Sequence, residues 1–112
     1  MDLNTYQMKA RETAVYKGKD KHEGLLYTGF AVAAEAGEVA GKLARMMRGD
    51  FDEQDAHQWR YDLSMELGDV LWALSQCAHE LGYNLEDIGN DNLRKLKERK
   101  LRGTLKGEGD NR

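Results

Sequence analysis

The chain has 112 residues, 40% of them hydrophobic and 33% charged, and its formal net charge is −3. This length fits a single domain, no apolar run reaches the roughly 18 residues of a membrane span, and the small negative charge argues against a nucleic-acid-binding protein. The charge is unevenly distributed, because residues 1–91 hold 9 basic and 17 acidic side chains whereas residues 92–112 hold 8 basic and 3 acidic ones. Any function must therefore explain an acidic body with a basic end.

Glycine separates the predicted elements, and the sequence contains no proline and little β-branched character. The apolar spacing predicts an all-α fold, a four-helix bundle whose helices end at glycines. Asn4 or Asp2 is expected to cap the first helix, and Asn84 with Asp87 gives a weak capping box at the fourth. The expected helices cover about residues 4–17, 25–48, 56–81 and 85–101 of one domain (1–112), followed by an irregular glycine-rich tail over 102–112.

Large aliphatic side chains are scarce, with 14 Leu, 4 Val, 2 Phe and 1 Ile. Glycines also interrupt the second and third predicted helices, where each costs up to about 1 kcal/mol relative to alanine. We expect close packing against another helix or a ligand to compensate for them. The shortage of bulky apolar residues predicts a homodimer or a tetramer that is a dimer of dimers. The interior glycines are Gly29, Gly37, Gly41 and Gly68.

Two pairs of acidic residues lie in the least polar parts of two predicted helices. Glu35 and Glu38 are three residues apart in the second helix, and Glu66 and Asp69 are three apart in the third. Residues at this spacing share one helix face, and ionised carboxylates on an apolar face need a cation. Four carboxylates from two antiparallel helices would suit a hard divalent ion such as Mg²⁺ or Mn²⁺. Ordinary partly exposed helix acids are the alternative interpretation.

The order and spacing of these acids resemble the metal-binding motif of the MazG family, which are all-α nucleoside triphosphate pyrophosphohydrolases. The likeness covers nearly the whole chain, and one departure is Ala34, at a position where many members carry an acid. The segments that carry it are Tyr6-Gln7 and Thr13, Tyr27 with AAEAGEVAGKLARMMR, ELGDVLWAL, the run Asn92, Lys95, Leu96 and Arg99, and the ending RGTLKGEGDNR.

The resemblance implies hydrolysis of a nucleoside triphosphate between its α and β phosphates, releasing a monophosphate and pyrophosphate. It implies two or more Mg²⁺ (or Mn²⁺) ions held by Glu35, Glu38, Glu66 and Asp69. Among these, Glu38, Glu66 and Asp69 are expected to be the firmest ligands. Glu35 is expected to double as the general base, so that Glu35 and Glu38 are the candidate catalytic residues.

The basic end of the chain supplies candidate phosphate-binding residues. Asn92, Lys95 and Arg99 lie on one face of the fourth predicted helix, where cations would meet the departing pyrophosphate. Arg112 in the tail is a further candidate, and the resemblance implies that the tail folds over a site, either of its own or of a neighbouring subunit. A solvated basic face is the alternative for the other cations of this helix.

Two other function classes are open on the sequence alone. A ferritin-like di-metal oxidase would need Glu-x-x-His pairs, which the chain lacks. A non-enzymatic helical module with a basic nucleic-acid-binding C-terminal end would leave the carboxylates on apolar faces unexplained. A cytoplasmic setting is expected, because the N-terminal segment lacks the apolar core of a signal peptide and Cys77 is the sole cysteine. The expected substrate is a deoxynucleoside triphosphate, with a guanine preference, as in short members from bacteria and their viruses.

Overall fold

The computed structural model describes residues 1–50 and 55–112 and consists of four helices, with no strand in those two ranges. The all-α prediction is confirmed. Residues 51–54, in the loop expected between the second and third helices, lie outside the described residues. Asp2, and not Asn4, caps the first helix, because its carboxylate accepts a hydrogen bond from the amide of Thr5 at 2.7 Å. The helices are α1 (Leu3–Arg11), α2 (His22–Arg48), α3 (Ala56–Leu81) and α4 (Leu85–Arg102).

Three of the four helices end at the glycines that the sequence indicated. Gly49, Gly82 and Gly103 follow α2, α3 and α4 with φ values of 98°, 82° and 71°. This left-handed backbone region favours glycine, and in each case the glycine amide donates to a carbonyl of the last helical turn. The start of α2, at His22, is slightly earlier than the expected Leu25.

The prediction that the first helix continues to about Lys17 is wrong, because α1 ends at Arg11. Tertiary contacts take the chain out of the helix beyond this point. Ala14 is buried with only 2% of its surface exposed, and the indole of Trp72 donates to the Thr13 hydroxyl at 2.8 Å. Contacts with α3 therefore decide the conformation of a segment whose local sequence would also suit a helix.

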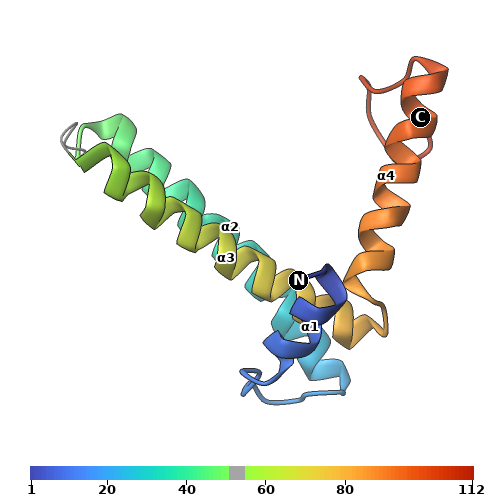
Figure 1. Cartoon of the computed structure of the whole chain (residues 1–112), viewed down its shortest axis with the longest axis horizontal. Coiled ribbons are helices and arrows are strands. Elements are labelled where there is room, and N and C mark those ends of the chain that lie inside the picture. The colour runs from blue at the N-terminus through green and yellow to red at the C-terminus, as the bar shows by residue number, and fades with distance from the viewer. Residues whose placement is uncertain (51–54) are drawn as a thin grey trace.

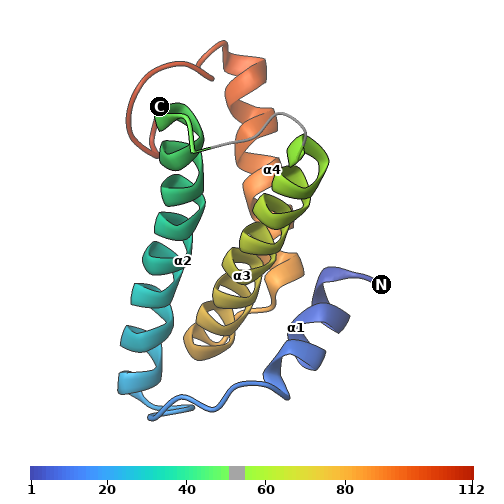
Figure 2. The ribbon, with the colours of Figure 1, turned by 90° about the vertical axis from the view of Figure 1, so that its left-hand side faces the viewer.

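Helices α2 and α3 form a long antiparallel hairpin, which Figures 1 and 2 show from two directions. Small side chains occupy buried positions of this hairpin: Ala73 and Ser75 of α3 and Thr28 of α2 are fully buried. The Thr28 hydroxyl donates to the Gly24 carbonyl at 2.8 Å and so has a partner inside the core. At Gly24, in the first turn of α2, a Cβ atom would lie only 2.4 Å from the carbonyl oxygen of Gly18 in the preceding loop, so the close approach of this loop requires glycine.

The interior glycines do not pack as expected within this chain. A Cβ atom built at Gly29, Gly37 or Gly68 would meet no atom within 4 Å, and one at Gly41 would meet only the flexible Arg45 side chain. The expectation of close packing against another helix is therefore not met in the part of the chain that the structure describes. The reason is that, among the helices in residues 1–50 and 55–112, only α3 contacts α2.

Helix α4 points away from the hairpin instead of lying along it (Figure 1). It contacts α1 and α3 but not α2. The Cα radius of gyration is 17.0 Å, compared with about 13 Å for a compact domain of this length. Large apolar side chains are consequently exposed, including Phe30 at 74%, Met47 at 84% and Leu101 at 79%. Within residues 1–50 and 55–112 no helix is long and apolar enough to span a membrane.

Two side chains of α1 fix the beginning of α4. The Gln7 side-chain oxygen accepts from the Leu85 amide at 2.9 Å, and the Asn4 side-chain oxygen accepts from the Glu86 amide at 3.1 Å. Asn84 occupies the predicted N-cap position, but its side chain makes no capping bond, so the expected capping box does not form. The first amides of α4 are instead satisfied from another helix, which sets where α4 starts.

Candidate metal centre

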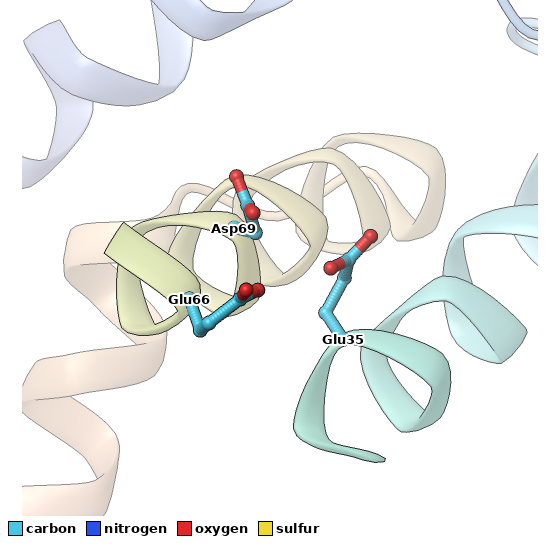
Figure 3. Close-up of side chains that lie close together, drawn as sticks. All are labelled: Glu35, Glu66 and Asp69. Carbon is cyan, nitrogen blue, oxygen red and sulfur yellow. The ribbon is translucent and has the colours of Figure 1, made fainter. Parts of the chain in front are cut away.

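Carboxylates from the two arms of the hairpin converge at one point. Glu35 of α2 faces Glu66 and Asp69 of α3, and one carboxyl oxygen from each residue lies within 4.8 Å of the other two (Figure 3). Glu66 and Asp69 share a face of α3 because they are three residues apart. The antiparallel hairpin brings Glu35 opposite them. Three of the four acids singled out in the sequence thus form one group.

We call Glu35, Glu66 and Asp69 the acidic group, and their negative charge is only partly compensated by neighbouring cations. Desolvation, and after it the negative charge of neighbouring carboxylates, raises the pKa of Glu35 above its ordinary range. The ammonium group of Lys42 offers partial compensation, because its Nζ lies 3.8 Å from Oε1 of Glu66. A cation at the centre would relieve the remaining repulsion.

The donor set fits a divalent metal ion. All three groups offer carboxylate oxygens, which Mg²⁺ and Mn²⁺ prefer as ligands. Oxygens bound to one Mg²⁺ ion at about 2.1 Å lie at most about 4.2 Å apart, so the acidic group, whose oxygens lie within 4.8 Å of one another, would need only a small side-chain movement to share an ion. Glu35 and Glu66 are partly buried and Asp69 is exposed, so an ion held here would still be open to a ligand from solvent.

Glu38 does not belong to the acidic group. It lies one turn beyond Glu35 on α2, its side chain is exposed, and it is close enough for its charge to raise the pKa of Glu35. The three-residue spacing does not by itself decide this, because Glu66 and Asp69 have the same spacing and both belong to the acidic group. The role of Glu38 as a ligand stays a prediction.

The candidate phosphate-binding residues lie on α4 and its tail, away from the acidic group. Lys95 and Arg99 both contact the Asp110 carboxylate, with N–O distances of 3.3 Å. Arg112 donates to carbonyls of the tail itself, and Asn92 is exposed beside Lys95 in a shallow pocket. Because α4 does not contact α2, one chain does not bring these cations to Glu35.

Two further residues of the site region were not predicted to be site residues from the sequence. Lys42 stands four residues after Glu38, a spacing typical of helical ion pairs that could have identified it, although its observed partner is Glu66 on the other helix. Tyr6 of α1 has a raised pKa, caused first by burial and then by the charge of Asp69. No spacing rule connects Tyr6 with α3, so only the fold reveals this neighbour.

Comparison with known proteins agrees with this geometry. Residues 26–103 match the model of the MazG nucleotide pyrophosphohydrolase domain, a span that includes all four acids and the whole of α4. The chain is also 42% identical over 115 residues to the Gene 37 protein of Mycobacterium phage L5, and the match covers 100% of both chains. No solved structure matches it. The domain match covers well over half of the sequence, and the chain therefore belongs to the MazG nucleotide pyrophosphohydrolase family.

Proposed function

We propose that the protein hydrolyses nucleoside triphosphates between the α and β phosphates, releasing a nucleoside monophosphate and pyrophosphate. The observation that carries this proposal is the convergence of Glu35, Glu66 and Asp69 inside the segment that matches the family. A bound Mg²⁺ or Mn²⁺ ion supplies charge neutralisation on the phosphate oxygens and lowers the pKa of a bound water. Two or more ions per site remain part of the proposal.

We propose different roles for the four carboxylates because their surroundings differ. Glu66 and Asp69 act as ligands from α3, and Glu35 completes the set from α2. The attacking water must lose a proton, which a nearby carboxylate can accept. Glu35 is proposed to act both as a ligand and as this general base, and Glu38, which is exposed and lies outside the acidic group, is proposed as a further metal ligand. Glu35 and Glu38 are thus both proposed as catalytic residues.

The phosphate-binding residues are proposed to meet the acidic group across a subunit interface. Lys95, Arg99, Asn92 and Arg112 lie on a helix and tail that do not reach the acidic group of their own chain. The exposed apolar side chains and the unpacked glycines of the hairpin support a second copy lying against it. We propose a homodimer, or a dimer of dimers, in which α4 of one chain faces the hairpin of the other.

The substrate class follows from these groups only in part. The cations suit a polyphosphate, and we propose a deoxynucleoside triphosphate with a guanine preference, acting in nucleotide-pool control in the cytoplasm of a bacterium or of an infected host cell. Nucleic-acid binding by the basic end is the competing proposal. The convergence of Glu35, Glu66 and Asp69 disfavours it, because a nucleic-acid-binding module would leave these carboxylates without a role.

The test is a hydrolysis panel over the eight common nucleoside triphosphates, with products separated by anion-exchange chromatography. Mg²⁺ or Mn²⁺ should yield monophosphate and pyrophosphate, and a chelator should abolish the reaction. Glu66→Gln should lower kcat/KM by at least about a hundredfold. Glu12→Gln, at an exposed glutamate just after α1, is the matched control and should retain activity. Release of orthophosphate, or equal activity in Glu66→Gln, would reject the proposal.

A further inference from the structure

The cations proposed to bind phosphate already hold an anion of their own chain. The Asp110 Oδ1 atom lies 3.3 Å from Nζ of Lys95 and 3.3 Å from Nη2 of Arg99. A carboxylate between a lysine and an arginine makes the same kind of contacts that a phosphate oxygen would make. The carboxylate of Asp110 and a polyphosphate would therefore compete for the same two cations.

The tail places Asp110 there through a defined set of hydrogen bonds. The Arg112 guanidinium donates to the carbonyls of Thr104 at 3.2 Å, Leu105 at 3.3 Å and Gly109 at 2.6 Å, which closes the tail into a loop. Gly109 has a φ of 82°, a value that glycine adopts readily. Arg99 adds a 3.1 Å bond to the backbone carbonyl of Asp110.

In this contact the Asp110 carboxylate can exchange with another anion, whereas the Arg99 guanidinium stays in place. Asp110 is 85% exposed, whereas Arg99 is 5% exposed and therefore fixed in position. Ion pairs that face water are weak, so displacement of the carboxylate costs little. The buried Nε atom of Arg99 has no hydrogen-bond partner, which leaves one donor unsatisfied by the tail.

We propose that Asp110 is a built-in competitor, whose carboxylate occupies Lys95 and Arg99 in the free protein and is displaced when a polyphosphate binds. The proposal rests on the proposed role of these two cations as phosphate-binding residues. Its consequence is weaker binding of both substrate and pyrophosphate, and so faster release of the product. The two cations lower the pKa of Asp110, in keeping with a carboxylate that is ionised near neutral pH.

Inorganic tripolyphosphate is the probe, titrated calorimetrically into the full-length protein without divalent metal at fixed, low ionic strength. Asp110→Asn removes the competing charge and keeps the size of the side chain. It should bind tripolyphosphate about three- to tenfold more tightly than the wild type, since two exposed ion pairs no longer oppose binding. Glu108→Gln is the matched control, because it removes one exposed charge from the same tail and should change affinity less than twofold.

The outcomes separate this proposal from the proposed function. Equal or weaker binding by Asp110→Asn overturns it, because Asp110 would then position the cations and not compete for them. Absence of tripolyphosphate binding in both proteins also overturns it, even if nucleotide hydrolysis is observed. Tighter binding by Asp110→Asn supports it, even if no nucleotide is hydrolysed and the proposed function fails. Circular dichroism checks that both variants are folded.

Discussion

Replacement of Gln7 by methionine tests whether one side chain of α1 holds α4 in place. Gln7 is 8% exposed, and its amide nitrogen donates to the carbonyls of Ser75 at 3.2 Å and Tyr83 at 3.0 Å. Its oxygen accepts from the Leu85 amide at 2.9 Å. Methionine has a similar length and volume, so no large cavity results, but all three bonds are lost. At about 1 kcal/mol for each bond, Gln7→Met should lower the free energy of unfolding by about 3 kcal/mol.

The assay is urea unfolding followed by circular dichroism at one protein concentration, because self-association would add to stability. The midpoint should fall by about 1 to 3 M urea with an unchanged m value. Gln58→Met is the matched control, since Gln58 makes one exposed bond, to Asp62 at 2.8 Å, and should lose less than about 0.5 kcal/mol. A loss below about 1 kcal/mol for Gln7→Met, or one equal to the control, would refute the reasoning.

Three other changes probe the fold and the acidic group. Glu80→Gln should cost about 2 to 4 kcal/mol in urea unfolding, because the carboxylate is 1% exposed and bonded to Arg11 and Tyr16; a cost below 1 kcal/mol contradicts this. Ala73→Leu should lower Tm by more than about 4 °C, because Ala73 has no exposed surface and a larger side chain would overpack its surroundings. An unchanged Tm would refute that close packing. Because the pKa of Glu35 is raised, the carboxyl group of Glu35 holds its proton more tightly in the folded, metal-free protein than in the unfolded chain. The free energy of unfolding should therefore fall as the pH rises from the ordinary glutamate pKa of 4.5 through the raised pKa of the folded state. Melting curves in EDTA should show this fall, Mg²⁺ or Glu35→Gln should reduce it, and a flat profile would count against the acidic group.

Local sequence was sufficient to predict most helix boundaries and the pairing of Glu66 with Asp69. Gly49, Gly82 and Gly103 end their helices because glycine adopts a left-handed backbone at little cost, a property of one residue that needs no partner. The pairing of Glu66 with Asp69 follows from helix periodicity alone. These predictions held because each depends on residues no more than one turn apart.

Rules that relate residues within one helical turn could not predict the early end of α1 or the separation of Glu38 from the acidic group. Ala14 leaves the helix because it is buried against the rest of the fold, a contact between residues far apart in sequence. Whether Glu35 or Glu38 faces Glu66 depends on how the two arms of the hairpin are rotated about their axes. That rotation is set by close packing of the small residues between them.

The sequence by itself determined an all-α chain with carboxylates gathered on two helices and cations on a third, because composition and periodicity are local properties. Only the tertiary structure decided that α4 points away from the hairpin, since its first amides bond to Gln7 and Asn4, side chains that lie some 80 residues earlier. It also decided that Lys95 and Arg99 are held by Asp110 in the free chain. Such long-range contacts depend on which surfaces meet in space, which no spacing along the chain encodes.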